Sequence, residues 1–343
     1  MTSNNASLNE NSSNSNVVVA GPCGGLDPKT ATEDASKFRI LARNQQFDGL
    51  TYETEGQWTG PYCFVQAADT QLGMMANFSE NKESTKAERI DWTAEVALMS
   101  RAIVAVNRLR PRPRFFVVCG DLIDALPGVA YRALQIRDFK ATLSKLSPEI
   151  RAVCVCGNHD VGNEPTEQSV SDYRRDFGDD FFEFWVGGCK YLVVNSQYYQ
   201  DDSMVKAIRT AQDDWLEARL RAEPSRPHQH LVGFQHIPPF LVDRNEERVA
   251  VFDHTTWCFN FGVKSERFAY LDRLKRAGMR KLFCGHYHRN AGGWDDELEV
   301  VVTSAVGCQL GSDGHGLRVV RVLEDRIEHD YYTLDDIPTE VTF

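Results

Sequence analysis

The 343-residue sequence has no apolar run of the roughly 20 residues that a membrane-spanning helix needs. Residues 1–16 are rich in Ser and Asn and contain no basic residue, and the apolar run at 17–20 is too short for the core of a secretory signal. Thr2 occupies the position where myristoylation requires glycine. We therefore expect no membrane partner.

Positive charge is also scarce. Asp and Glu outnumber Lys and Arg, 49 to 38, which gives a formal net charge of -11 and a pI of about 5.4. Broad binding to nucleic acid or to an anionic membrane requires basic surfaces, so we expect no nucleic-acid partner. An acidic protein can still hold phosphate where metal ions supply local positive charge.

The cysteines do not form a disulfide or zinc pattern. There are nine, an odd number, and Cys119, Cys154, Cys156 and Cys284 stand inside apolar runs. Buried free thiols in a reducing compartment fit this placement. Cys154 and Cys156 would share one face of a strand, but a structural zinc site needs further Cys or His ligands, usually as a second close pair, which the sequence lacks.

Strands and helices alternate from about residue 62 onwards. Before them, residues 1–36 form a low-complexity segment that we expect to be a disordered Ser/Asn-rich tail, followed by one domain over residues 37–343. The predicted strands cover 62–68, 114–119, 151–156, 191–194, 230–234, 281–284, 298–304, 317–323 and 327–333. The predicted helices cover 86–109, 131–146, 207–222 and 266–277. Alternation early in the chain and consecutive strands late in it predict two sheets between layers of helices.

Five polar motifs stand at or just beyond the ends of predicted strands. They are Asp69-Thr70-Gln71, Gly120-Asp121-Leu122-Ile123-Asp124, Gly157-Asn158-His159-Asp160, His236 and Gly285-His286-Tyr287-His288. Strand ends of this kind meet at one rim of a sheet, so the motifs are expected to form one site. A set of Asp, Asn and His at one rim is what a two-metal phosphoester-cleaving site needs.

Each residue type in these motifs has a defined use at such a site. The two oxygens of the Asp121 carboxylate can bridge two cations, and Gly120 permits the sharp approach of the backbone that this requires. Asp69 offers a carboxylate, while Gln71 and Asn158 offer amide oxygens. The imidazoles come from His236, His286 and His288. Hard oxygen ligands mixed with imidazole favour Mn, Zn or Fe.

Together the motifs resemble those of the calcineurin-like metallophosphoesterase superfamily, and the resemblance extends over about residues 58–337. It implies a single-domain four-layer α/β/β/α sandwich that binds two divalent metal ions: Mn, Zn, Fe or Mg. It assigns Asp69, Gln71, Asp121 and His288 to the first metal, and Asp121, Asn158, His236 and His286 to the second.

The resemblance also implies hydrolysis of phosphomonoesters, specifically a serine/threonine phosphatase that acts on phosphoproteins in the cytoplasm. In the mechanism that we infer, a metal-bridging hydroxide attacks phosphorus in line. His159, beside Asn158, would protonate the leaving alkoxide as general acid. Asp124 would hold the His159 imidazole and favour its protonated form.

Two positions depart from the superfamily pattern. Gln71 stands where the first motif usually has His, and an amide oxygen is a weaker donor than imidazole to a borderline metal, so the first metal is expected to bind loosely or to be Mn or Mg. Ala125 stands where serine/threonine phosphatases of the calcineurin type carry a phosphate-binding Arg. Arg289 and Asn290 are alternative phosphate ligands, or structural surface groups.

Other interpretations stay open at this point. The sequence lacks the Cys-x5-Arg, Asp-x-Asp and Gly-x-Ser-x-Gly motifs of other hydrolases. Within the superfamily, the alternative is a phosphodiesterase for cyclic nucleotides or other diesters. Outside enzymes, it is a non-catalytic binding scaffold with a degraded metal site. Residues 237–264 show little regular pattern and form either a lid beside the site or a layer of aromatics packed over the core.

Overall fold

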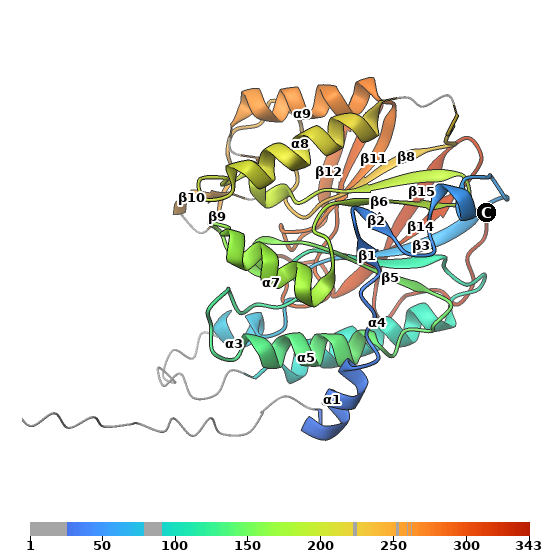
Figure 1. Cartoon of the computed structure of the whole chain (residues 1–343). Helices are drawn as coiled ribbons and strands as arrows, with labels where there is room; N and C mark the ends of the chain where they lie inside the picture. Colours follow the sequence, from blue (N-terminus) through green and yellow to red (C-terminus); the bar gives the residue numbers. More distant parts are fainter. Residues whose placement is uncertain (1–25, 79–90, 222–224, 252–253, 259, 262) are drawn as a thin grey trace, which may run out of the picture.

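Two β-sheets lie face to face between two layers of helices in the computed structural model (Figure 1). The structure describes residues 26–78, 91–221, 225–251, 254–258, 260–261 and 263–343. The helices are α1 (Pro28–Ala35), α2 (Tyr52–Glu55), α3 (Met74–Phe78), α4 (Thr93–Arg108), α5 (Arg132–Leu143), α6 (Asn158–Val161), α7 (Glu167–Phe177), α8 (Lys206–Leu220) and α9 (Lys264–Arg276), with a 3-10 turn at Ser196–Tyr199.

The smaller sheet has the strand order β15-β14-β3-β4-β5. Its strands are β3 (Tyr62–Ala67), β4 (Phe115–Cys119), β5 (Arg151–Val155), β14 (Gly316–Val322) and β15 (Ile327–Thr333). Strands β3, β4 and β5 run parallel, whereas β14 is antiparallel to both of its neighbours. The carboxyl ends of three strands therefore meet at one edge.

The larger sheet has the order β1-β2-β6-β7-β8-β11-β13-β12. Its strands are β1 (Ala42–Arg43), β2 (Gln46–Phe47), β6 (Phe182–Val186), β7 (Cys189–Val193), β8 (Leu231–Phe234), β11 (Met279–Cys284), β12 (Ala291–Asp295) and β13 (Leu298–Val302). Strands β7, β8, β11 and β13 are parallel. A separate two-stranded ribbon pairs β9 (Ala250–Val251) with β10 (His254–Cys258).

Alternate residues of strand β4 are buried in two different cores, one on each face of the smaller sheet. Phe115 and Val117 point into the core between the sheets, and Phe116 and Val118 point into the core under α4 and α5. This alternation follows from the two-residue period of a strand buried on both faces. A third core lies between the larger sheet and helices α8 and α9, which cover it in Figure 1. The predicted four-layer α/β/β/α fold in a single domain is confirmed.

The predicted strands and helices coincide with observed elements, but several elements have no counterpart among the predictions. Helix α7 and strand β6 are two of them. Strand β6 reads Phe-Glu-Phe-Trp-Val and forms a hairpin with β7 through Gly187 and Gly188, both at positive φ. The apolar alternation and the Gly-Gly turn are hairpin signals. The start of the predicted helix at residue 86 lies outside the described residues.

Helix α1 falls within the segment predicted as a tail. Asp27 caps it by accepting from the backbone N–H groups of Lys29 and Thr30, and Pro28 occupies its first turn. Ala31 is buried, and Phe38 beyond the helix packs edge-on against Phe177. The chain therefore has packed structure before residue 36, and the division at that residue stays a prediction. Residues 1–25 lie outside the described part of the chain.

The segment at 237–264 contributes aromatic packing. Phe240 and Phe261 are buried in the core under α9, where the Phe261 ring lies 5.1 Å from that of Tyr199. This segment was predicted to be either a lid beside the site or a layer of aromatics over the core. Phe240 and Phe261, near its two ends, pack in the core. Among the helices that the structure describes, none is both long enough and apolar enough to cross a membrane.

The core between the sheets gives a first prediction. Phe64 on β3 is fully buried and stacks on Phe115 at 4.4 Å, and its ring also contacts Tyr191, Phe234 and Phe283 of the other sheet. We expect Phe64→Ala to lower the free energy of unfolding by about 3–5 kcal/mol, because it leaves a cavity between the sheets. Urea denaturation measures this change. Phe343→Ala, at an exposed site, should change it by under about 0.5 kcal/mol. Equal losses in both variants would contradict the assigned packing.

A charged tie between the sheets gives a pH-dependent prediction. Burial opposes ionisation of Glu299 on β13, but hydrogen bonds from His329 and Lys281 outweigh it and lower its pKa from 4.5 to about 2. A lowered pKa in the folded state stabilises the fold above pH 4.5, and this contribution is lost as the pH falls towards 2. We expect Glu299→Gln to be less stable than wild type at pH 7. The difference in melting temperature should shrink between pH 4.5 and 3, and a pH-independent difference would contradict the assignment.

Candidate metal centre

The seven predicted metal ligands all lie on turns that directly follow parallel strands. Asp69 and Gln71 follow β3, Asp121 follows β4 and Asn158 begins α6 after β5. From the larger sheet, His236 follows β8, and His286 and His288 follow β11. The carboxyl edges of both sheets thus meet at one place, and a hydrogen bond joins them there: the N–H of His286, after β11, donates to Oδ2 of Asp69, after β3, at 2.9 Å.

The backbone at these turns adopts an uncommon conformation. Eight non-glycine residues in the described part of the chain have positive φ, and five of them are predicted ligands: Asp69, Gln71, Asp121, His286 and His288. A left-handed residue costs about 1–3 kcal/mol, and such residues concentrate at functional sites. The left-handed turn reverses the chain at the strand end, and this clustering is independent structural support for a site.

Glycines before the ligands allow the loops to approach closely. Gly120 has a φ of 81°, and a Cβ there would overlap the His236 ring. A Cβ at Gly285 would lie 2.6 Å from Oδ2 of Asp69. In both cases a predicted ligand from the other sheet occupies the space that any other residue would need. Larger residues at 120 or 285 would push these ligands apart.

The side chains fall into two groups that share one carboxylate. Asp121, His236 and His286 offer atoms within 4.8 Å of one another, and so do Asp69, Asp121 and His288. Nε2 of His236 lies 3.2 Å from Oδ2 of Asp121 and 3.1 Å from Oδ1 of Asn158. Nε2 of His288 lies 3.3 Å from Oδ1 of Asp69. Asp121 therefore belongs to both groups, each of which could hold a cation.

Backbone carbonyls orient two of the imidazoles. Nδ1 of His236 lies 2.8 Å from the carbonyl of Cys119, and Nδ1 of His288 lies 2.5 Å from the carbonyl of Cys308. In each ring the Nε2 atom is left facing the carboxylates. Such contacts fix the tautomer and ring orientation of metal-binding histidines.

The site has an excess of buried negative charge. Asp69 and Asp121 are 0% and 2% exposed, and their ion pairs among the described residues are with histidines. Burial opposes protonation of His236, but the charge of Asp121 outweighs it and raises the His236 pKa to about 9. The same pair holds the pKa of Asp121 below its usual range in spite of burial. Paired carboxylates at this depth need positive charge, which divalent cations supply.

The NH2 groups of the two predicted amide ligands, Gln71 and Asn158, are both bound by neighbouring acceptors. The NH2 group of Asn158 donates to Oδ1 of Asn163 at 2.9 Å, and that of Gln71 donates to Oδ1 of Asp124 at 3.1 Å. Oε1 of Gln71 is buried and has no hydrogen-bond partner among the described residues. A buried, unpaired carbonyl oxygen is costly unless something accepts its lone pairs. The donor set therefore fits a metal, including at the position where Gln71 departs from the superfamily pattern.

His159 lies at the open side of the cluster, with its side chain 26% exposed. Its Nδ1 lies 2.6 Å from the carbonyl oxygen of Asp124 and 3.5 Å from Oδ1 of the same residue. Asp124 therefore contacts the ring mainly through its backbone carbonyl, and its role towards His159 stays a prediction. With Nδ1 engaged, Nε2 is the nitrogen that can deliver a proton.

Two side chains of helix α5 form hydrogen bonds to the loops of the site, and neither was predicted from the sequence. The Arg132 guanidinium donates to the carbonyls of Ala125, His159 and Asp160. Gln135, one helical turn later, accepts from the N–H of Ala125 at 2.8 Å. Both lie on one face of α5, so they hold the Asp124 loop and the His159 turn together. Their i, i+3 spacing at the start of a predicted helix is the only signal that the sequence carries.

Buried carboxylates brace the remaining turns. Asp160 accepts from the N–H groups of Gly157 and Leu122 at 2.8 and 3.2 Å, and so ties the β5 turn to the β4 turn. Glu95 on α4 is 1% exposed and accepts from the N–H of Met75 at 2.8 Å and from that of Gly73 at 3.2 Å. Glu95 therefore fixes the loop that follows Gln71.

The two alternative phosphate ligands differ in their surroundings. The Asn290 side chain accepts from Arg318 at 3.0 Å and from the N–H of Ser304 at 3.3 Å, which makes Asn290 a structural residue. The Arg289 guanidinium lies over the Tyr287 ring at 4.8 Å. Ala125, at the position of the missing arginine, is buried.

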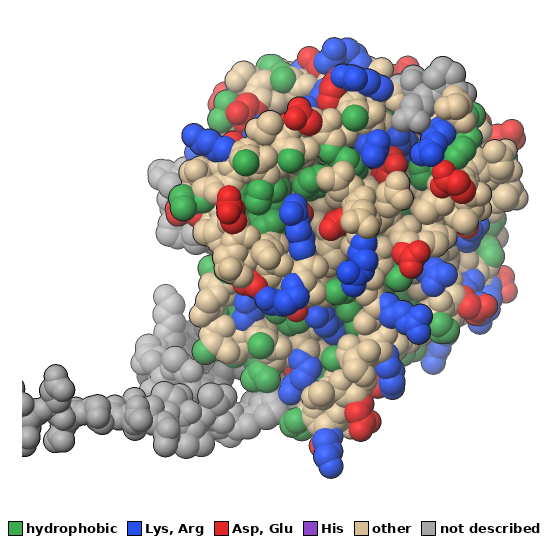
Figure 2. All heavy atoms as spheres, viewed as in Figure 1, with side chains coloured by type: hydrophobic (Ala, Val, Ile, Leu, Met, Phe, Trp, Pro, Cys, Tyr) green, Lys and Arg blue, Asp and Glu red, His purple; other side chains and the backbone are tan. Residues whose placement is uncertain are grey.

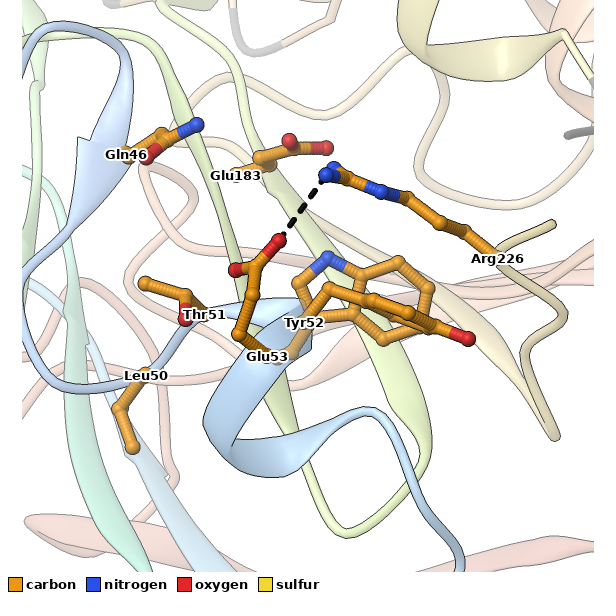
Figure 3. A pocket seen from close by; sticks show the side chains of 8 residues that line it. Gln46, Leu50, Thr51, Tyr52, Glu53, Glu183 and Arg226 are labelled. Carbon is orange, nitrogen blue, oxygen red and sulfur yellow. Dashed lines mark hydrogen bonds and ion pairs between the residues drawn. The ribbon is translucent and has the colours of Figure 1, made fainter.

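A small surface pocket lies elsewhere, along β2, α2 and β6. Figure 3 shows Arg226 reaching across it to Glu53, with which it forms an ion pair of 3.0 Å above Tyr52. None of the predicted ligands lines this pocket, and Arg226 forms part of its wall. The chemistry of the site therefore depends on the cluster at the strand ends and not on this pocket.

Comparison with known proteins supports this interpretation. A model of the calcineurin-like phosphoesterase family matches residues 65–290. The chain is 44% identical to the serine/threonine-protein phosphatase CPPED1 of Mus musculus over 308 residues, which cover 90% of this chain and 95% of that protein. It is also 44% identical to the protein of the same name from Danio rerio, over 89% of this chain and 94% of that protein.

The fold also has solved counterparts. A crystal structure of a dimetal phosphatase from Danio rerio has a TM-score of 0.55 and 17% identity, covering 80% of this chain and 96% of that one. At this identity the likeness concerns the fold alone. The family model and the high identity over nearly whole proteins show that the chain belongs to the calcineurin-like phosphoesterase family, as its sequence motifs predict.

Proposed function

We propose that this phosphoesterase is a serine/threonine protein phosphatase that uses two divalent metal ions. The observation that carries the proposal is the pair of ligand groups that share the buried carboxylate of Asp121. The names of the relatives at 44% identity support protein phosphoserine and phosphothreonine as substrates. Mixed oxygen and imidazole donors, with an amide in place of one imidazole, favour manganese among the candidate ions.

The proposed roles of the residues follow from their positions. Asp69, Gln71, Asp121 and His288 would hold one metal, and Asp121, Asn158, His236 and His286 the other. When bound, the metals supply an activated water and positive charge for phosphoryl transfer. His159 would donate a proton from Nε2 to the leaving oxygen, while the carbonyl of Asp124 holds Nδ1. Arg132 and Gln135 keep these two loops in register.

We propose a phosphoprotein partner in the cytoplasm. Lys and Arg side chains lie among Asp and Glu side chains on the face shown in Figure 2, so this face offers no broad basic surface for nucleic acid. Seven of the nine cysteines are buried free thiols, which is typical of a reducing compartment.

The first test is hydrolysis by metal-stripped protein with and without Mn²⁺. We expect cleavage of p-nitrophenyl phosphate and of phosphoserine and phosphothreonine peptides to need added metal, and cleavage of bis(p-nitrophenyl) phosphate to be slower. Asp121→Asn should lower kcat/KM by about 10³-fold or more, because it removes the ligand common to both groups. Faster diester cleavage would favour the phosphodiesterase. No turnover with any metal would favour the binding scaffold.

The role of His159 is tested by varying the leaving group. We expect His159→Ala to lower kcat about 10²–10⁴-fold on a phosphoserine peptide, whose alkoxide needs a proton. The loss should be much smaller on p-nitrophenyl phosphate, because nitrophenolate leaves without protonation. His228→Ala, which changes an exposed histidine beside Trp185, serves as the control and should keep both rates. Equal losses on the two substrates would rule out proton donation by His159.

A further inference from the structure

The amide of Gln71 can serve a metal in only one of its two orientations. Its oxygen is a ligand, whereas its NH2 group is a donor that repels a cation. The superfamily pattern usually has His at this position. When one imidazole nitrogen is held by a hydrogen bond, the other nitrogen is free to bind the metal, so no choice between two ends arises. With Gln at this position, a neighbouring group must fix the orientation of the amide so that its oxygen faces the metal.

Asp124 meets that need. Its Oδ1 accepts from the Gln71 NH2 group at 3.1 Å, and its Oδ2 accepts from the NH2 group of Asn77. A carboxylate has only acceptor atoms, so it binds the nitrogen end of Gln71 and excludes the oxygen end. Gln71 is 1% exposed and Asp124 6%, which leaves water little access to compete.

The unpaired oxygen of Gln71 is the second observation. With its NH2 group bound to Asp124, Oε1 is buried without a hydrogen-bond partner among the described residues. The other amide ligand repeats the arrangement, since the NH2 group of Asn158 is held by Oδ1 of Asn163 while its own Oδ1 faces Nε2 of His236. In both cases an acceptor behind the amide turns its oxygen towards the ligand cluster.

We propose that Asp124 is the positioning residue for Gln71, and that its carboxylate turns the amide oxygen towards the first metal. The inference rests on the metal centre of the proposed function and assigns Asp124 a task beyond its contact with His159. The same Oδ1 atom lies 3.1 Å from the Gln71 nitrogen and 3.5 Å from Nδ1 of His159. Asp124 thus links the first metal to the proposed general acid.

The test measures metal binding, which does not depend on His159 chemistry. Mn²⁺ is titrated into metal-stripped protein, with stoichiometry from elemental analysis and the spin coupling of two adjacent Mn²⁺ ions from electron paramagnetic resonance. We expect Asp124→Ala to weaken one of two sites about 10–100-fold and to abolish the coupled signal, because loss of a residue that orients a ligand typically has this effect. Asp124→Asn keeps a carbonyl oxygen for Gln71, while exposed Asn77 can turn over, so its affinity should stay within about 3-fold of wild type.

Two controls separate orientation from charge. Asn77→Ala removes the other amide bound to the same carboxylate and should keep both metals. In a Gln71→His background, Asp124→Ala should cost much less affinity than it does in wild type, because imidazole needs no amide orientation. Thermal melting of the metal-free variants shows whether each one folds.

Each outcome decides the matter. Selective loss in Asp124→Ala, retention in Asp124→Asn and a smaller cost in the Gln71→His background would establish the positioning role. Equal losses in Asp124→Ala and Asp124→Asn, or equal costs in both backgrounds, would overturn it in favour of a simple charge effect. Unchanged affinity for two metals in Asp124→Ala would show that Asp124 has no role in metal binding. Wild-type protein that binds fewer than two metals would overturn the proposed metal centre itself.

Discussion

The left-handed turn that follows each strand is the constraint on which the site depends. The parallel strands of both sheets end at the same edge, and the chain must reverse there within one or two residues to bring a side chain back over the sheet. Asp69, Asp121 and His286 do so at positive φ, at an energetic cost that the surrounding backbone bonds offset. The glycine before Asp121 then lets a ligand from the other sheet lie against the turn. Without this close approach the two sheets would not share one carboxylate.

The predicted ligands are held from behind by hydrogen-bond acceptors rather than by positive charges. Carbonyl oxygens orient His236 and His288, and oxygen acceptors orient the amides of Gln71 and Asn158. Two buried carboxylates therefore remain with histidines as their only ion-pair partners among the described residues. Buried carboxylates destabilise a fold unless positive charge balances them. Their burial at this site therefore favours the binding of cations.

Helix α5 connects the packing of the fold to the chemistry of the site. Its apolar face packs under the smaller sheet through residues such as Phe139, and its first turn places Arg132 and Gln135 against the peptide groups of two active loops. The guanidinium N–H groups of Arg132 donate to backbone carbonyls of these loops. In this chain an arginine near the Asp124 loop shapes the site, although Ala125 offers no guanidinium for phosphate.

The sequence by itself determined the layers, the family and the residues that meet at the rim. Apolar runs of five or six residues and amphipathic helices are local patterns, and Asp69, Asp121 or His236 could be placed at strand ends because the motifs adjoin those runs. Helix α7, strand β6 and helix α1 escaped this reasoning because tertiary contacts stabilise short or polar segments more than propensity does. Only the tertiary structure decided which atoms face one another: that Asp124 holds His159 through its carbonyl, takes the nitrogen of Gln71, and leaves that amide oxygen unpaired. Those contacts join residues from the turns after three different strands, β3, β4 and β5, and no pattern along the chain records the distance or angle between them.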